Sequence, residues 1–137
     1  MSSPPRILFV CVENAGRSQM AEGFARLHGA DRIAACSAGS RPSGIVNPRA
    51  IMFMVERGVD LSAKDSKSLH VFDGQSFDAV ITMGCGDACP WLPARYRENW
   101  ALPDPKHLPD EEFRAVRDEI EQRVMALLER LGGKSSA

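Results

Sequence analysis

A short apolar run that ends at turn residues and is followed by a helical pattern constrains this chain more than any other feature. Residues 6–12 are apolar and rich in β-branched and aromatic side chains, which is typical of a central strand buried on both faces. Residues 13–16 have turn chemistry, and from Ser18, a good N-cap residue, apolar side chains recur at helical spacing. The apolar positions of this helix are Met20, Phe24 and Leu27. The segment therefore predicts a strand, a loop and a helix in that order.

Strand and helix patterns continue to alternate along the rest of the chain. Residues 32–37 and 77–83 are predicted strands, and helices are predicted over about 48–58 and 110–131. The expected buried face of the first of these helices consists of Ile51, Met52 and Val55. The apolar stripe of the second consists of Phe113, Val116, Ile120, Val124, Leu127, Leu128 and Leu131. This alternation favours an α/β fold with a parallel sheet, in which ligands bind beyond the carboxyl ends of the strands.

The size and charge of the chain limit what else it can be. Its 137 residues, 44% of them hydrophobic, suit a single domain over 1–137 with flexible ends at about 1–5 and 132–137. The 17 basic and 18 acidic side chains give a formal charge of −1, which offers no electrostatic reason for a nucleic acid or membrane partner. The N-terminal residues 1–6 lack the apolar stretch expected of a secretory signal, and no segment approaches the roughly 20 apolar residues of a membrane span. We therefore expect a cytoplasmic protein whose four cysteines rest as thiols.

The loop 11–18 has the parts that a site for a tetrahedral oxyanion requires. Such a loop must let backbone N–H groups converge at a helix N-terminus and must offer a planar cation for bidentate contact. Asn14 and Gly16 tolerate unusual backbone angles, and Arg17 supplies the guanidinium fork. The same field stabilises the thiolate of Cys11, the expected nucleophile, and Ser18 is placed to donate a hydrogen bond to its sulfur. The predicted substrate-binding residues are Val12, Glu13, Asn14, Ala15, Gly16, Arg17 and Ser18.

A plainer interpretation makes Cys11 a buried cysteine at the end of a strand and Arg17 a surface charge. The pattern of a Cys, five residues, Arg and Ser is only moderately specific by itself. Its position after a buried strand and before an amphipathic helix is the context that the chemistry needs. This position favours a functional loop.

Around this loop the sequence resembles arsenate reductases built on the low-molecular-weight tyrosine phosphatase fold. The resemblance begins with Cys11, Arg17 and Ser18, followed by residues 19–23. It extends over nearly the whole chain, through 37–39, 47–48, 84–90, 104–105 and 116–120. It implies a four-stranded parallel sheet flanked by helices, with Cys11 as nucleophile, Arg17 and the loop amides as the oxyanion cradle, and Asp104 as general acid.

A reductase also needs two electrons, and Cys85 and Cys89 are the candidate source. If their segment is helical, the four-residue spacing places their Cα atoms about 6 Å apart, which a disulfide can span. The resemblance implies that Cys11 attacks arsenic, that Cys85 attacks the Cys11 adduct and releases arsenite, and that Cys89 resolves the Cys11–Cys85 disulfide. An external thiol reductant then clears the last disulfide, and no tightly bound cofactor is expected. Cys36 lies within a predicted strand and is expected to be a core residue.

The reductant is less clearly indicated than the nucleophile. The interval between Cys85 and Cys89 is shorter than in the best-known thioredoxin-coupled pattern, and a similar motif occurs in reductases that use a low-molecular-weight thiol such as mycothiol. The expected partner is therefore thioredoxin or a mycoredoxin-type protein, and the sequence leaves that choice open. Two other interpretations of the pair are a zinc site, which lacks the usual spacing and matching histidines, and two buried thiols without a function.

A cation site behind the loop is a further possibility that the resemblance raises. Glu22 and Ser37 match positions that help to hold a monovalent cation in some relatives. Lys64 and Lys67 lie in the region that would complete such a site, and a lysine ammonium can replace the ion. We therefore predict no required metal, and we expect Asn14 to support the loop from within.

A low-molecular-weight protein tyrosine phosphatase is the main alternative function. Asp104-Pro105 suits a simple turn, but it also suits an acid that protonates a leaving oxygen in either enzyme. In the phosphatases this pair is typically followed by tyrosines that flank the substrate ring, whereas here Lys106 and His107 follow and Tyr96 lies elsewhere. Arsenate reduction with weak phosphatase activity is therefore the preferred hypothesis.

An oxyanion-binding or redox-sensing module without turnover is the second alternative. A reactive sulfur in contact with the anion has no purpose in a site that only binds. The loop therefore favours an enzyme.

Overall fold

The structure is a computed structural model that describes residues 4–84 and 93–131. These residues contain a four-stranded parallel sheet with the strand order β2-β1-β3-β4. The strands are β1 (Arg6–Cys11), β2 (Ala34–Gly39), β3 (Phe77–Thr82) and β4 (Ala94–Asn99). The helices are α1 (Arg17–Gly29), α2 (Pro48–Val55) and α3 (Asp110–Arg130), and the 3-10 turns are η1 (Ala30–Arg32), η2 (Leu69–Phe72) and η4 (Pro105–His107). The predicted α/β fold with a four-stranded parallel sheet flanked by helices is confirmed.

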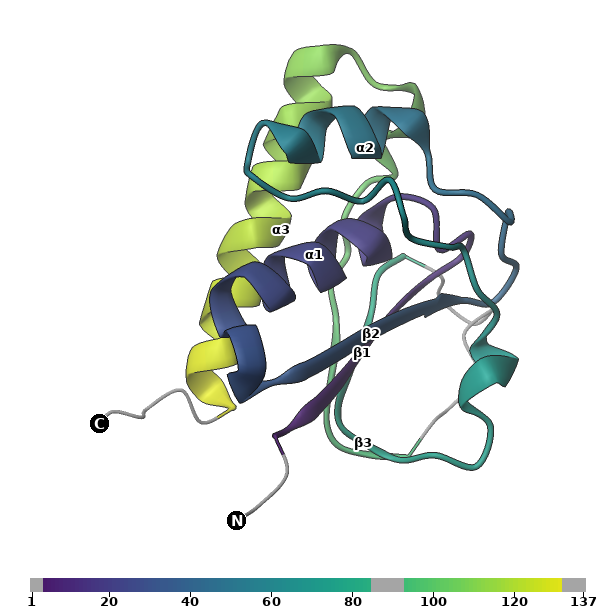
Figure 1. Cartoon of the computed structure of the whole chain (residues 1–137), viewed down its shortest axis with the longest axis vertical. Coiled ribbons are helices and arrows are strands. Elements are labelled where there is room, and N and C mark those ends of the chain that lie inside the picture. The colour runs from purple at the N-terminus through teal and green to yellow at the C-terminus, as the bar shows by residue number, and fades with distance from the viewer. Residues whose placement is uncertain (1–3, 85–92, 132–137) are drawn as a thin grey trace.

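β1 lies inside the sheet, and its side chains alternate between two apolar clusters. Ile7 and Phe9 belong to a core cluster shared with α1, α2 and α3. Leu8 and Val10 belong to a second cluster on the opposite face, which η2 covers. Figure 1 shows α1 and α3 crossing one face of the sheet, with η2 on the other side. The strand is thus buried on both faces, as its uninterrupted apolar run predicts.

The carboxyl ends of β1 and β3 lie side by side at the point where the order of strand addition changes from one side of β1 to the other. β2 pairs with one side of β1, and β3 pairs with the other side. In open parallel sheets, ligands bind beyond the carboxyl ends of the strands at such a switch point. α2 and the N-terminal end of α3 lie toward this end of the molecule (Figure 1). The fold therefore directs attention to the loop that follows β1.

β4 is an edge strand that the sequence pattern did not reveal. The segment Ala94–Asn99 has no fully buried residue, and it pairs only with β3 among the described strands. Charged side chains occupy three of its six positions. Charged side chains are common on edge strands because they oppose pairing with another chain. Only the resemblance had implied a fourth strand.

The predicted buried face of α2 is wrong for two of its three residues, since only Ile51 packs, partly buried, against the core. Met52 is 52% exposed and Val55 is 60% exposed, whereas Phe53 is only 1% exposed. The ring of Phe53 lies 4.9 Å from the ring of Phe113 on α3, so α3 determines which side of this short apolar helix is buried. Almost every side chain of α2 is apolar, so the sequence offers two neighbouring stripes of similar character.

Leu27 in α1 is a second difference, because the helical pattern placed it in the core and it is 46% exposed. In its last turn α1 meets α3 through His28, whose Nε2 lies 2.7 Å from Glu121 Oε2. Leu27 lies beside this contact and faces solvent. Met20 and Phe24, the other two predicted positions, are fully buried.

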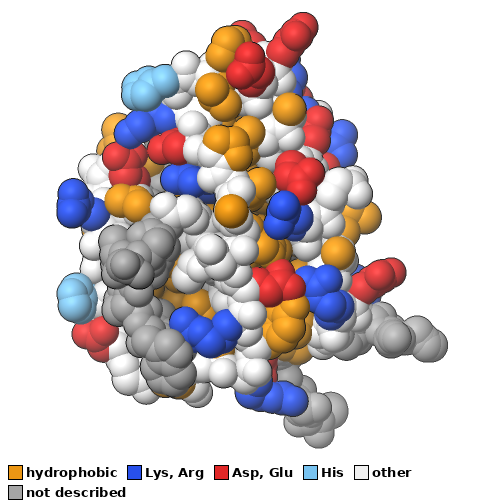
Figure 2. Space-filling model, turned by 180° about the vertical axis from the view of Figure 1, so that it is seen from behind, with side chains coloured by type: hydrophobic (Ala, Val, Ile, Leu, Met, Phe, Trp, Pro, Cys, Tyr) orange, Lys and Arg blue, Asp and Glu red, His pale blue; other side chains and the backbone are white. Residues whose placement is uncertain are grey.

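The predicted stripe of α3 is largely confirmed. Phe113, Val116, Ile120, Val124 and Leu127 are buried, and Leu128 and Leu131 pack against the same cluster while partly exposed. On the face seen in Figure 2, acidic and basic side chains are interspersed with hydrophobic ones. None of the helices in the described part of the chain is long and apolar enough to cross a membrane.

Candidate active site

Cys11 and Arg17 lie at the two ends of the loop that connects β1 to α1. Cys11 is the last residue of β1 and is 3% exposed. Arg17 is the first residue of α1, and Gly16 is the N-cap. The predicted N-cap, Ser18, instead lies inside the first turn of the helix, where no side chain caps the N-terminus. Its hydroxyl is used for another purpose.

Ser18 is hydrogen-bonded to the sulfur of Cys11, as the loop chemistry predicts. The Oγ of Ser18 lies 2.9 Å from Cys11 Sγ, and Asn14 Nδ2 donates to the same Oγ at 2.8 Å. Because Oγ accepts the Asn14 N–H, the hydroxyl proton is available to the sulfur. Ser18 therefore supplies a hydrogen-bond donor beside the sulfur of the predicted nucleophile.

Asn14 holds the loop from within, which agrees with its expected role. Its side-chain oxygen accepts the backbone N–H of Lys67 at 2.8 Å and Nε2 of Gln19 at 3.0 Å. Since a backbone N–H can only donate, this contact also determines which side of the amide faces Ser18. The backbone of Asn14 has φ of 51°, a left-handed conformation that asparagine tolerates better than most residues.

Arg17 lies between two segments that are distant in sequence. Its Nη1 donates to the carbonyl of Leu102 at 2.9 Å, and its Nη2 lies 3.7 Å from Asp104 Oδ2. Gly84, the residue that precedes Cys85, also lies against this guanidinium. A Cβ on Gly84 would lie 2.3 Å from Nη1, so only glycine fits here without displacing the guanidinium.

A cavity of about 200 Å³ is lined by three of the five predicted catalytic residues, the three that lie within residues 4–84 and 93–131. Cys11, Arg17 and Asp104 all line it, so the predicted nucleophile, cation and acid are brought together. Its other lining residues are Val12, Glu13, Ala15, Gly16, Asn47, Pro105, Lys106 and Phe113. Two of the predicted binding residues, Asn14 and Ser18, are fully buried and support the loop instead of lining the cavity.

The sequence interpretation missed three contributors to this cavity. Asn47 caps α2 and donates its backbone N–H to Ala15 O at 2.9 Å, which ties α2 to the oxyanion loop. Phe113 lines the cavity from α3, and Lys106 lines it from η4. Two sequence signals were present: Asn47 precedes a proline, as a helix N-cap residue often does, and Lys106 stands where the tyrosine phosphatases typically have a tyrosine. Neither signal indicates that the residue lies near Cys11.

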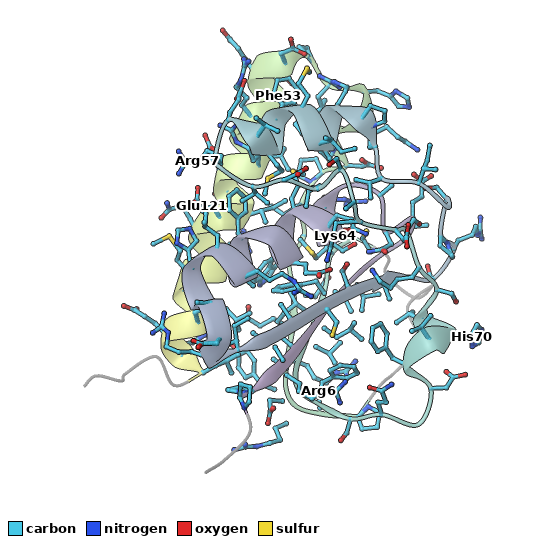
Figure 3. All side chains as sticks on the ribbon, in the orientation of Figure 1. Arg6, Phe53, Arg57, Lys64, His70 and Glu121 are labelled. Atoms are coloured by element: carbon cyan, nitrogen blue, oxygen red, sulfur yellow. The ribbon has the colours of Figure 1, made fainter. Side chains whose placement is uncertain are left out.

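Lys64 provides the expected ammonium behind the loop. Its Nζ lies 2.9 Å from Oε2 of Glu22, whose Oε1 accepts a hydrogen bond from Ser37 at 2.6 Å. Figure 3 shows Lys64 reaching toward the start of α1. Burial alone would raise the pKa of Glu22, but the hydrogen bonds from Ser37 and Lys64 outweigh it and hold that pKa below its ordinary value. Lys67 does not join this cluster, because its Nζ contacts the carbonyl of Asp65.

Cys36 is half-buried on β2 and packs against the second apolar cluster. Burial raises the pKa of its thiol. This position fits a structural residue better than a nucleophile. Cys85 and Cys89 lie outside the described residues.

A model of the low molecular weight phosphotyrosine protein phosphatase family matches residues 6–137. The chain belongs to this family. Among its members, the glutaredoxin arsenate reductase of Synechocystis sp. is 40% identical over 129 residues, which cover 92% of this chain and 98% of that protein.

Solved structures of arsenate reductases share the fold. An arsenate reductase in the phosphate binding state is 40% identical and superposes with a TM-score of 0.86, covering 93% of this chain and 99% of the other. The thioredoxin-dependent arsenate reductase of Corynebacterium glutamicum is 35% identical, with a TM-score of 0.77, and the match covers 96% of this chain and 64% of that one.

Proposed function

We propose that this protein is an arsenate reductase in which Cys11 attacks arsenic. The observation that carries the proposal is the cavity shared by Cys11, Arg17 and Asp104, with Ser18 hydrogen-bonded to the sulfur. Arsenate and phosphate share charge and shape, so a loop suited to phosphate suits both. The relatives named arsenate reductase support arsenate as the substrate.

The first step forms a bond between sulfur and arsenic. The thiolate of Cys11 attacks arsenic while the Arg17 guanidinium and the loop amides bind the oxyanion. An As–O bond breaks, and Asp104 gives its proton to the departing oxygen, which leaves as water. Asp104 suits this role because it lines the cavity and its side chain is 50% exposed, so it can exchange protons with solvent.

The second step transfers the electrons. A second thiolate attacks the sulfur of Cys11, the S–As bond breaks, and its electron pair remains on arsenic, which leaves as arsenite. The two sulfurs are left as a disulfide. We assign this attack to Cys85, with Cys89 then resolving the disulfide. Arg17 touches Gly84, the residue before Cys85, which supports this assignment because the chain passes Gly84 beside the oxyanion site.

An external thiol reductant completes the cycle by reducing the last disulfide. One relative is named a glutaredoxin arsenate reductase and another a thioredoxin-dependent one, which supports a redoxin partner for this chain. We propose that the reductant is thioredoxin or a low-molecular-weight thiol with its redoxin. We also propose that residues 1–137 form a single domain and that the enzyme acts in the cytoplasm.

One assay tests the proposed function and identifies the reductant. Arsenate reduction is measured with thioredoxin, with glutaredoxin plus glutathione, and with mycoredoxin plus mycothiol, in separate reactions. We expect turnover with at least one system, and we expect Cys11→Ser to abolish it together with any hydrolysis of p-nitrophenyl phosphate. Circular dichroism checks that the variant is folded. Substantial residual turnover in Cys11→Ser contradicts the mechanism.

Phosphatase activity toward aryl phosphates is the second candidate, because the family model is named for it. The cavity of about 200 Å³ is smaller than the roughly 300–1,000 Å³ typical of pockets that hold organic ligands. We therefore propose only weak hydrolysis of aryl phosphates.

A further inference from the structure

An ion pair joins the oxyanion loop to the segment that carries the proposed acid. Lys106 Nζ donates to both carboxylate oxygens of Glu13, at 3.0 and 2.9 Å. Both residues line the cavity that holds Cys11, and their side chains are 35% and 39% exposed, whereas Cys11 is almost fully buried. The pair therefore forms part of the rim of the cavity and Cys11 part of its floor. We call Glu13 and Lys106 the rim pair.

The backbone of Lys106 is fixed, so this is not a freely moving surface lysine. Its N–H donates to Asp104 Oδ1 at 3.0 Å, and its carbonyl accepts from Arg49 Nη1 at 3.0 Å. Arg49 also reaches Asp110 Oδ1 at 3.0 Å, which ties the turn to the start of α3. Little backbone entropy remains to be lost when the rim pair forms.

The backbone of Glu13 is held in the same way. Its carbonyl accepts from Ser66 Oγ at 2.8 Å and from Ser43 N at 3.1 Å. The hydrogen bond and the charge of Glu13 raise the pKa of Lys106, so the ammonium stays charged through the neutral range. The rim pair thus connects two anchored segments.

An ester of the oxyanion has to pass this rim. When the anion sits on Arg17 above Cys11, a substituent on one of its oxygens projects toward the open side of the cavity. An aromatic ring there would press against Glu13 and Lys106 or separate them. Separation would remove their mutual hydrogen bonds, and the ring could not replace those bonds for either charged group. An inorganic oxyanion makes no such demand, and pairing with Lys106 also screens it from the negative charge of Glu13.

We propose that the Glu13–Lys106 rim pair determines substrate specificity by admitting inorganic oxyanions and disfavouring aryl esters. The proposal rests on the proposed attack by Cys11 and adds the chemical class that this attack accepts. It explains how a chain of a phosphatase family can retain the oxyanion loop and still discriminate against phosphate esters.

The test compares two activities in the same variants. kcat/KM is measured for arsenate reduction and for hydrolysis of p-nitrophenyl phosphate, and the inhibition constant of inorganic phosphate is measured for each. In Lys106→Ala and Glu13→Ala we expect the ratio of ester to arsenate kcat/KM to rise by about tenfold or more, the usual scale for altered pocket contacts. If the wild type hydrolyses no detectable ester, activity should appear in these variants.

Three controls separate the ion pair from general damage. Lys106→Arg retains the charge pair and should keep the wild-type ratio. Glu13→Lys and Lys106→Glu should each raise the ratio, and the double exchange should return it toward wild type. Arg123→Ala removes one charge from an exposed pair with Glu119 on α3, a contact of 2.7 Å that involves no residue of the cavity, and should leave the ratio unchanged.

Each outcome decides the proposal. A ratio within about twofold of wild type in both alanine variants overturns it, and so does an equal loss of both activities in Lys106→Arg, which would make Lys106 necessary for turnover itself. Absence of Cys11-dependent arsenate reduction in the wild type contradicts the proposed function instead. The two failures are therefore distinguishable.

Discussion

At the scale of single residues, the guanidinium of Arg17 is held by the protein itself. Leu102 accepts a hydrogen bond from Nη1, Asp104 lies beside Nη2, and Gly84 lies against the guanidinium close to Nη1. The residue is only 8% exposed. A cation positioned in this way needs little reorganisation to bind an oxyanion, which is how electrostatic stabilisation becomes effective.

We predict that Gly84→Ala displaces Arg17. The new Cβ would lie 2.3 Å from Nη1, in a backbone with φ of 85°. Loss of a charge-assisted hydrogen bond of about 1.5–3 kcal/mol should lower kcat/KM for arsenate and weaken phosphate binding roughly tenfold to hundredfold. Steady-state kinetics and phosphate inhibition measure the change.

Gly74→Ala is the matched control for this variant. Gly74 has φ of 80°, but a Cβ there meets no atom within 4 Å. It therefore reproduces the backbone strain without touching Arg17. Equal losses of activity in the two variants would contradict displacement of the guanidinium, and thermal denaturation of both measures the strain that they share.

At the scale of elements, the contact between α2 and α3 positions the acid loop. Phe53 packs on Phe113 at one point of this contact, and beyond the end of α2 the carboxylate of Glu56 is bound by Arg114 at 3.0 and 2.9 Å and by Arg117 at 2.7 Å. Figure 3 labels Phe53 on α2, near the top of the view and above α1. Because η4 directly precedes α3, a fixed α3 also fixes the approach of Asp104 to Arg17.

The charged part of this contact should make stability depend on pH. Hydrogen bonds from Arg114 and Arg117 lower the pKa of Glu56 from 4.5 to about 2. A carboxyl group whose pKa is lower in the folded chain stabilises it above the unfolded pKa, and that contribution is lost as the pH falls through the folded value. We predict that Glu56→Gln lowers Tm at pH 7 and that its difference from wild type narrows between about pH 4.5 and 2.

Thermal denaturation across this pH range measures the effect. Glu119→Gln is the control, because Glu119 pairs with Arg123 within α3 and joins no second helix. A constant Tm difference between Glu56→Gln and wild type at every pH would refute the role of the ion pair.

At the scale of the whole molecule, folding assembles the site from segments that are far apart in the chain. The loop 11–17 and the segment 104–106 line one cavity, and Gly84, two residues after β3, and Leu102 both contact Arg17 at its edge. The sheet makes this possible, since β1 and β3 are neighbours and their carboxyl ends lie at the same edge. The proposed electron transfer extends this assembly to the segment that begins at Cys85.

We predict that Cys85→Ser loses multiple-turnover arsenate reduction yet keeps hydrolysis of p-nitrophenyl phosphate. Hydrolysis needs only Cys11, Arg17 and the acid, whereas reduction also needs a second sulfur. Cys36→Ser should keep both activities, because Cys36 does not line the cavity. Full reductase activity of Cys85→Ser with thioredoxin as the sole reductant would exclude Cys85 as the internal thiol.

Local patterns predicted much of this molecule. The buried strand before Cys11, the oxyanion loop and the stripe of α3 all depend on residues close together in sequence, whose spacing matches strand or helix periodicity. The hydrogen bond between Ser18 and Cys11 was predictable for the same reason, since both residues belong to one short loop.

The amino-acid sequence by itself determined the alternation of strands and helices and placed Cys11, Arg17 and Ser18 in one short loop between a strand and a helix. Only the tertiary structure decided that Phe53 is buried in place of Met52, that Ala94–Asn99 is an edge strand, and that Glu13 pairs with Lys106. Periodicity cannot choose between two apolar stripes on one short helix, nor can it show that residues 93 positions apart become neighbours. Those choices depend on which surfaces remain to be buried once the sheet has formed.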